Sequence, residues 1–264
     1  MRESALQEQY RQQQKRRKYR VHFLRLFLFI LFLALWEISA RTGLIDSFIF
    51  SSPSQIAETC ISLTLEEGLF VHIGVTLYET LASFLLVLVF GVGAAVVLWL
   101  FPGAARVCEP YLVILNSLPK SALAPLLIVW LGANTTTIIV SGMSVAIFGS
   151  IMNLYTGFSE IDKDKLTLIY TLGGTKRHAL FKVVLPGSIP LILSVLKVNI
   201  GLCLVGVIIG EFIGARQGLG FLIIYASQVF KMPWLISSIV ILCVIAVILY
   251  FLLNLLERWY TRKR

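Results

Sequence analysis

The stretch SEIDKDKLTLIYTLGGTKRHALFKVVLPGSIP, residues 159–190, is polar, basic and helical in pattern, and long apolar runs flank it on both sides. It holds five basic side chains: Lys163, Lys165, Lys176, Arg177 and Lys182. A glycine pair, Gly173 and Gly174, divides it, and Leu185-Pro186 opens the next apolar run. A membrane protein that keeps one structured, charged loop in mid-chain usually uses it to contact another molecule. We expect this loop to contact something in the cytoplasm.

The composition indicates a polytopic membrane protein. The chain has 264 residues, of which 58% are hydrophobic and 14% charged, and its mean hydropathy is +0.86. Soluble domains are about 45–50% apolar and about 25% charged. The four cysteines lack CxxC spacing and the three histidines lie far apart, so we expect no catalytic, cofactor-binding or metal-binding residues. We also expect no cleavable signal peptide, because the first apolar run is too long.

Six apolar runs predict an all-α fold with six transmembrane helices. We place these spans at residues 21–40, 81–101, 109–131, 135–158, 187–213 and 233–257. The segment before residue 81 is interpreted as a separate amphipathic entry helix. In the third span, Pro110 fits a first helical turn, whereas Pro119 is expected to break the helix. Such a break is tolerated only where protein or a water-filled cavity covers the freed backbone.

The distribution of charge predicts the orientation. With six spans and a cytoplasmic N-terminus, 17 of the 23 Lys and Arg residues lie on the inner side, 3 on the outer side and 3 inside apolar runs. This bias places both termini in the cytoplasm and explains the net charge of +9 without a nucleic-acid partner. The expected organisation is a basic cytoplasmic tail at 1–20, a transmembrane domain at 21–257 with its cytoplasmic loop at 159–186, and a basic cytoplasmic tail at 258–264.

Within the central loop, local signals predict a helical hairpin. Asp162 and Asp164 stand where a helix N-terminus favours acids. Leu166, Ile169 and Leu172 recur at three-residue steps, which predicts one apolar face. The glycine pair is expected to end this helix. A second basic amphipathic helix at 175–185 then leads to Pro186, in the first turn of the fifth span. The alternative is a hairpin that lies on anionic headgroups.

The same residues resemble the cytoplasmic signature of permease subunits of binding-protein-dependent ABC importers, E-A-A-x3-G-x9-I-x-L-P. Gly173, Val183, Leu185 and Pro186 match it in register. The resemblance covers most of the chain and looks closest to the nitrate/taurine/sulfonate branch. That branch's pattern is seen in Trp36-Glu37, Pro53-Ser54, His72, Thr76-Leu77, Leu118-Pro119-Lys120, Pro125-Leu126, Trp130-Leu131-Gly132, Asn153, Gly157, Leu172-Gly173, Val184-Leu185-Pro186, Pro190, Glu211 and Gly218-Leu219-Gly220.

One departure concerns the acidic residue of the signature. Thr167-Leu168-Ile169 replaces Glu-Ala-Ala, which excludes a salt bridge from position 167 and changes the packing at the next two positions. The resemblance still implies docking of the loop into a groove of a cytoplasmic ATPase. The residues expected to couple to the ATPase are Leu166, Thr167, Leu168, Ile169, Leu172, Gly173, Gly174, Thr175, Lys176, Val183, Leu185 and Pro186.

The resemblance further implies a type I ABC importer (MetI-like) permease fold in the inner or plasma membrane of a prokaryote. The implied partners are two ATPase subunits, a second permease copy or paralogue, an extracytoplasmic solute-binding protein and the lipid bilayer. The chain has no G-x4-G-K-[ST] motif, so ATP and Mg²⁺ are expected on the partner ATPase and no enzymatic activity is expected here. The implied solute is small and anionic (sulfonate, taurine, nitrate or bicarbonate), or else a pyrimidine or flavin precursor. An ion-coupled secondary transporter is the alternative from another class.

Polar residues inside apolar runs are candidates for the translocation pathway, because charges are costly in lipid. Lys197 lies about eleven residues into its span, roughly 16 Å deep at 1.5 Å per residue. The candidates are Asn116, Lys120, Trp130, Lys197, Asn199 and Glu211. The alternative for the charged ones is an internal ion pair or a packing role, or, for Lys120, a side chain that extends along apolar surface to place its charge at the membrane interface. Similarly, Gly206, Gly210 and Gly214 predict close helix packing, either within the chain or between permeases.

Overall fold

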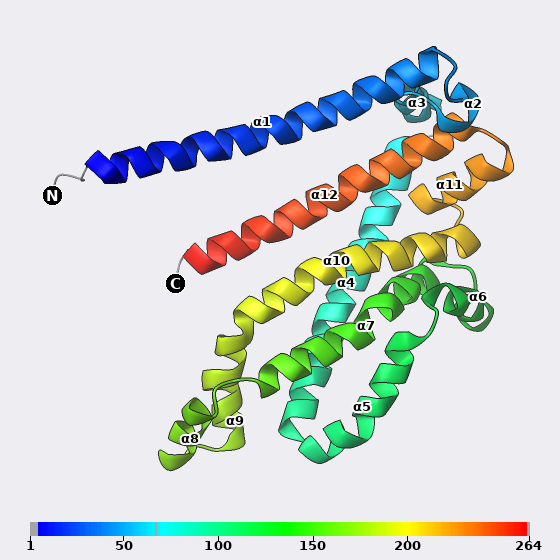
Figure 1. Cartoon of the computed structure of the whole chain (residues 1–264). Coiled ribbons are helices and arrows are strands. Elements are labelled where there is room, and N and C mark those ends of the chain that lie inside the picture. The colour runs from blue at the N-terminus through cyan, green and yellow to red at the C-terminus, as the bar shows by residue number, and fades with distance from the viewer. Residues whose placement is uncertain (1–4, 67, 263–264) are drawn as a thin grey trace.

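The computed structural model describes residues 5–66 and 68–262, and in these residues every regular element is a helix (Figure 1). The first four and last two residues of the two basic tails lie outside the described part. Five helices are long and apolar enough to cross a membrane, and a bent helix pair gives a sixth candidate span. The five spans correspond to the apolar part of α1 (Ala5–Arg41) and to α4 (Leu69–Leu100), α7 (Thr135–Ser159), α10 (Leu185–Gly214) and α12 (Met232–Arg262). The predicted all-α polytopic fold is confirmed.

The second span differs from the prediction. Helix α4 is one continuous helix of 32 residues, about 48 Å long, so the separate entry helix before residue 81 was wrong. The polar residues of its first half do not mark a surface helix. His72, Thr76, Glu79 and Thr80 are all buried against other helices. Their polarity therefore serves contacts inside the protein, and no break in the helix is needed.

The third span is broken, as Pro119 predicts. Helix α5 (Pro102–Ser117) and helix α6 (Lys120–Leu131) meet at an angle of 96°. Leu118 and Pro119 are extended between them, because a residue before proline avoids the helical region. The prediction for Pro110 was wrong. Pro110 lies inside α5, and Pro102 occupies the first turn instead.

Helix α7 packs closely against α4 and α10, and small residues make this approach possible. A Cβ atom at Gly206 would lie 2.8 Å from the Gly142 Cα and 2.9 Å from the Ser141 carbonyl oxygen. Gly210 faces Ile138 on α7, and Gly214 faces Ile128 on α6. The glycine stripe of α10 therefore packs within the chain, which is one of the two alternatives that the sequence left open.

Three short helices lie at the opposite end of the bundle from α8 and α9, in Figure 1 at the right. They are α2 (Ser47–Phe50), α3 (Pro53–Glu66) and α11 (Leu219–Gln228). Helix α1 is held there through Glu37, whose carboxylate accepts hydrogen bonds from the Ser54 backbone N–H (3.1 Å) and hydroxyl (2.8 Å). Beyond this contact α1 lies apart from the main bundle, and its apolar side chains from Phe23 to Phe32 are exposed.

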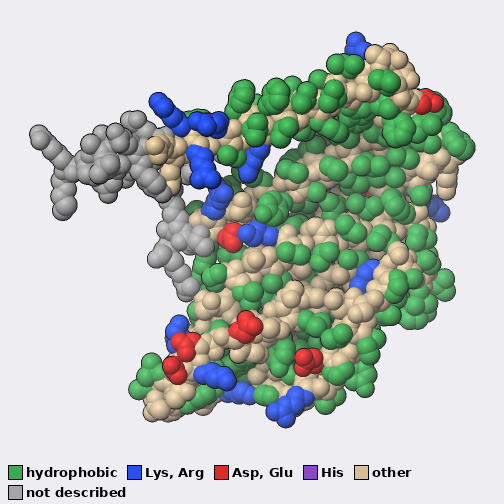
Figure 2. Space-filling model, viewed as in Figure 1, with side chains coloured by type: hydrophobic (Ala, Val, Ile, Leu, Met, Phe, Trp, Pro, Cys, Tyr) green, Lys and Arg blue, Asp and Glu red, His purple; other side chains and the backbone are tan. Residues whose placement is uncertain are grey.

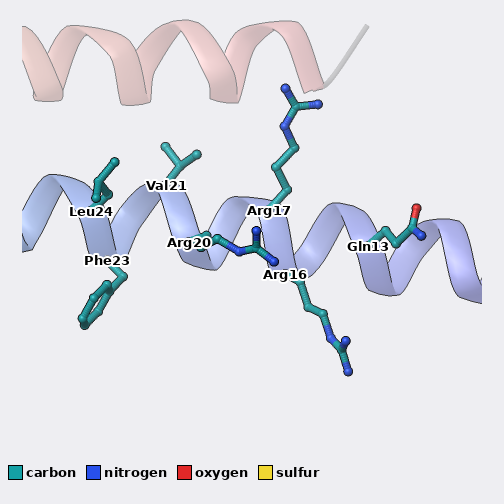
Figure 3. A pocket seen from close by; sticks show the side chains of 7 residues that line it. All are labelled: Gln13, Arg16, Arg17, Arg20, Val21, Phe23 and Leu24. Atoms are coloured by element: carbon teal, nitrogen blue, oxygen red, sulfur yellow. The ribbon is translucent and has the colours of Figure 1, made fainter.

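Basic side chains gather at the end of the molecule where α1 begins, α12 ends and the central loop lies (Figure 2). On α1, Arg17 points toward the end of α12 and Arg16 points away from it (Figure 3). These arginines and Arg20 line a hollow of about 660 Å³, together with Phe23 and Leu24 at the start of the apolar part. We call this end of the molecule the basic end.

Candidate functional site

The central loop forms a helical hairpin at the basic end. Its first helix, α8 (Lys163–Thr171), begins as predicted from the acids. The Asp162 side chain caps it by accepting a hydrogen bond of 2.9 Å from the Asp164 N–H. Such a cap satisfies one of the free N–H groups of a helix start and places negative charge at its positive end.

The glycine pair ends α8 with two specific backbone hydrogen bonds. The Gly174 N–H donates to the Ile169 carbonyl (2.8 Å), and the Gly173 N–H donates to the Tyr170 carbonyl (3.0 Å). This is a Schellman motif, which requires a left-handed residue after the helix. Gly173 has φ +79°, and a Cβ atom at Gly174 would overlap Ile169. The predicted helix stop is confirmed, and both positions require glycine.

The second arm of the hairpin is not a separate helix, which corrects the prediction. Helix α9 (Lys176–Ala179) continues through a π-helical segment (Leu180–Val184) directly into α10. The Leu185 N–H bonds to the Leu180 carbonyl, five residues back. Pro186 gives the physical reason, because it has no N–H to continue the regular ladder and a π turn accommodates it. The second arm of the hairpin and the fifth span are therefore one helical body, residues 176–214.

Apolar side chains are exposed at the tip of the hairpin. Leu168 is 59% exposed and Leu172 is 77% exposed, whereas Leu166 and Ile169 are half-buried. The single face predicted for Leu166, Ile169 and Leu172 was wrong for Leu172, because α8 ends at Thr171. The Thr167 hydroxyl donates to the Lys163 carbonyl (2.9 Å) on the exposed side.

A hollow of about 420 Å³ lies between α8 and the start of α10. Leu168, Ile169, Val183 and Pro186 line it, so the structure brings these four candidate coupling residues together from two helices. Leu185 instead packs inward, against the buried cluster around Phe158.

Lys176 has a role within the chain that the sequence did not reveal. Its Nζ donates to the Leu100 carbonyl at the end of α4 (2.7 Å) and lies 5.9 Å from the centre of the Trp99 ring. A cation is favourable at a helix C-terminus, where carbonyl groups are free. Its neighbour Thr175 caps α9, and the Thr175 N–H donates to His178 Nδ1 (3.0 Å). The hairpin is therefore attached to α4 as well as to α10.

Three of the six pathway candidates make contacts inside the bundle. Lys197 pairs with Glu257 of α12 at 2.5 Å, which is the internal ion pair that the sequence left open. The Asn199 amide donates to the Ser150 hydroxyl (2.9 Å) and is 3% exposed. The Glu211 side chain is 1% exposed.

The other three candidates lie on α5 and α6: Asn116 and Lys120 flank the bend between these helices, and Trp130 lies near the far end of α6. Lys120 donates to the Leu115 carbonyl (2.5 Å), and its Nζ lies 5.1 Å from the centre of the Phe148 ring. Asn116 is exposed, and Trp130 is 70% exposed. We call this bend, with Asn116 exposed on one side and the half-buried Lys120 on the other, the α5–α6 elbow.

The sequence did not reveal the buried polar network around Glu211. The Thr76 hydroxyl donates to Glu211 (2.7 Å) and accepts a hydrogen bond from the Leu219 N–H (2.8 Å). The Gly218 N–H donates to His72 Nδ1 (3.0 Å). The available signal was the polar spacing at 72, 76 and 79, one helical face within an apolar run.

The ion pair of Lys197 gives a testable prediction. Lys197→Met is expected to lower stability by about 1–3 kcal/mol, because it removes the ammonium that pairs with the half-buried Glu257 carboxylate. Thermal unfolding of the purified permease measures this. Adding Glu257→Leu should recover most of the loss. If the double variant is stable but cannot transport, Lys197 acts on the solute and the packing role is wrong.

Residues 87–264 match the family model described as "Binding-protein-dependent transport system inner membrane component". The chain belongs to this family. It is an ABC importer permease of the inner membrane, and such a subunit is not itself normally catalytic. Membership implies ATPase and solute-binding partners, and it excludes the secondary transporter alternative.

The matches between this permease and its known relatives span most of both chains. It is 28% identical over 229 residues to the formylaminopyrimidine transport permease protein ThiX of Halalkalibacterium halodurans, a match that spans 87% of this chain and 91% of the relative. It is 26% identical over 230 residues to the putative aliphatic sulfonates transport permease protein SsuC of Bacillus subtilis, spanning 86% and 82%. Among solved structures, the inward-facing MetNI methionine ABC transporter is similar, with a TM-score of 0.65, 20% identity and coverage of 76% of this chain and 97% of that chain. This likeness confirms the MetI-like fold.

Proposed function

We propose that this permease forms the membrane pathway of an ATP-driven importer and that its hairpin, residues 159–186, couples the pathway to a separate ATPase. The observation that carries the proposal is the attachment of one exposed apolar tip to two spans. Leu168 and Leu172 are available for contact. The arm behind them is continuous with α10, and Lys176 holds the end of α4. A displacement of the tip is therefore transmitted to both helices.

The proposed assembly has two permeases, two cytoplasmic ATPase subunits and one solute-binding protein on the outside. ATP and Mg²⁺ belong to the ATPase, because this chain lacks the phosphate-binding loop motif. Both termini and the hairpin are assigned to the cytoplasm. The gathering of Lys and Arg at the basic end supports this orientation (Figure 2).

The α5–α6 elbow is the proposed lining of the pathway. A bend of 96° at membrane depth needs a partner or a water-filled cavity to cover its backbone. Asn116 and Lys120 at the elbow, and Trp130 near the far end of α6, would meet the solute as the two permeases open alternately to each side. Lys197, Asn199 and Glu211 support this lining from within the bundle.

For the substrate, we propose a small sulfonate-like anion. The relative SsuC supports this choice. With Lys197 paired to Glu257, Lys120 is the cation that remains at the elbow to attract an anion. A vitamin-precursor pyrimidine is the second candidate, and the similarity to ThiX favours it.

Coexpression with a candidate partner ATPase from the same organism tests the coupling proposal. The intact permease should retain the ATPase through purification, whereas deletion of residues 171–176 should abolish retention while membrane insertion survives. Reconstituted complexes with the cognate binding protein should take up labelled taurine or an alkanesulfonate only with ATP. Unchanged retention after the deletion contradicts the docking role, and uptake of a pyrimidine but no sulfonate contradicts the substrate.

A further inference from the structure

Two glutamates lie side by side in the buried interior, at the opposite end from the hairpin. Glu79 of α4 and Glu211 of α10 are each 1% exposed, and their carboxyl groups lie within hydrogen-bonding reach of each other. Among the described residues, no Lys or Arg forms an ion pair with either one. Two adjacent buried carboxylates cannot both be ionised without a compensating cation. One of the pair therefore carries a proton.

The hydrogen-bond donors around Glu211 assign its charge. The Gly220 N–H donates to its Oε2 (2.5 Å), and the Thr76 hydroxyl is 2.7 Å from its Oε1. The Thr76 oxygen already accepts from the Leu219 N–H, so its single proton is directed to Glu211. Both carboxyl oxygens of Glu211 thus accept hydrogen bonds. That is the arrangement of an ionised carboxylate.

Glu79 has the opposite surroundings. Its Oε2 is buried and has no hydrogen-bond partner among the described residues. This oxygen therefore lacks the N–H or O–H donor that an ionised carboxylate needs, in contrast to both oxygens of Glu211. A protonated Glu79 would instead donate one hydrogen bond to Glu211.

From this geometry we infer a proton-binding site. Glu79 is protonated, and its O–H donates a hydrogen bond to the ionised carboxylate of Glu211. The proton joins α4 to α10, and through Gly220 and Leu219 it also holds the start of α11. The charged and titratable groups around the pair are His72 on α4, which is bound to Gly218, and Arg216 in the loop after α10.

A cavity connects this site to the surroundings. It measures about 230 Å³ and is lined by Glu79 together with Asn134, Arg216 and Gln217, at the end opposite to the hairpin. A proton can therefore exchange with the solution on that side. When pH rises and Glu79 ionises, two like charges face each other, and the contact between α4 and α10 weakens. The stabilisation is present at acidic pH and is lost as the solution becomes alkaline.

Two isosteric substitutions distinguish the roles of the two glutamates. Glu79→Gln keeps a hydrogen-bond donor toward Glu211, so it should match the wild type at acidic pH and should not lose stability at alkaline pH. Glu211→Gln replaces an acceptor oxygen by an amide that faces donors, so its unfolding temperature should fall at every pH, by roughly 5 °C or more. The exposed Glu160→Gln serves as the matched control and should behave as the wild type.

Thermal unfolding of the full-length permease across this pH range gives the first readout, and infrared spectroscopy gives the second. A carbonyl band of a protonated carboxylic acid should be present in the wild type and in Glu160→Gln, and absent in Glu79→Gln. The proposal is overturned if Glu79→Gln is as destabilised as Glu211→Gln, or if the band survives in Glu79→Gln. It is also overturned if the two variants exchange behaviours.

Discussion

The double substitution Leu168→Asp and Leu172→Asp is expected to abolish binding of the partner ATPase while the permease stays folded in the membrane. The two side chains are 59% and 77% exposed at the tip of the hairpin, so the fold does not need them. Burying a leucine at an interface contributes about 1.5–3 kcal/mol. Losing two such contacts weakens binding by at least roughly 100-fold. Affinity purification of the ATPase with the permease measures the loss, and ATP-dependent uptake should disappear with it.

Leu65 provides the matched control for this experiment. It is 79% exposed at the end of α3, opposite to the hairpin, so Leu65→Asp makes the same chemical change at the same exposure. This variant should retain the ATPase fully. Equal retention by the hairpin variant and the control would show that the tip is not the docking surface. Loss in both would indicate damage to the fold.

Local chemistry explains which parts of the fold could be predicted from the sequence. The start of α8 depends on Asp162 and its end on Gly173 and Gly174, and all of these signals lie within a dozen residues of chain. The break at Pro119 likewise follows from a missing N–H and a restricted preceding residue. Apolar runs of spanning length predicted the transmembrane helices, because a segment that crosses lipid must hydrogen-bond its own backbone groups and therefore forms a helix.

The sequence could not reveal what depends on distant partners. Glu257 is 60 residues from Lys197, and Glu211 is 135 residues from Thr76. Nothing local distinguishes a glutamate that pairs with another helix from one that faces a cavity. The same reason explains α4. Its polar residues suggested a surface helix, and only the positions of α10 and α11 show that they are buried.

The candidate site was predicted in outline but not in its connections. The signature pattern located the hairpin through Gly173, Val183, Leu185 and Pro186. It gave no indication that the second arm of the hairpin is continuous with α10. Nor did it show that Lys176 reaches the end of α4. These two links attach the hairpin to both α4 and α10, and the link to α4 arises from packing of segments far apart in the chain.

Leucine at Gly206 is expected to prevent assembly of the folded permease. A side chain at this position meets backbone atoms of α7, the Gly142 Cα and the Ser141 carbonyl, and backbone cannot move aside as a flexible side chain can. The Ser141 hydroxyl also donates to the Gly206 carbonyl (2.9 Å), so separating the helices breaks that bond. Overpacking by even one carbon typically costs about 1–3 kcal/mol. Gly206→Ala should therefore lower the unfolding temperature clearly, and Gly206→Leu should leave aggregated protein on size-exclusion chromatography.

Gly201 lies five residues earlier on the same helix and supplies the control. It is exposed, and a Cβ atom there would have no heavy atom within 4 Å. Gly201→Leu gains the same helix propensity as Gly206→Leu, so the difference between the two isolates the packing of α7 against α10. We expect Gly201→Leu to elute as a single folded species with an unfolding temperature at or above that of the wild type. If the two leucine variants are equally stable, the close approach of α7 and α10 at Gly206 is wrong, and the glycine stripe must serve a contact between permeases.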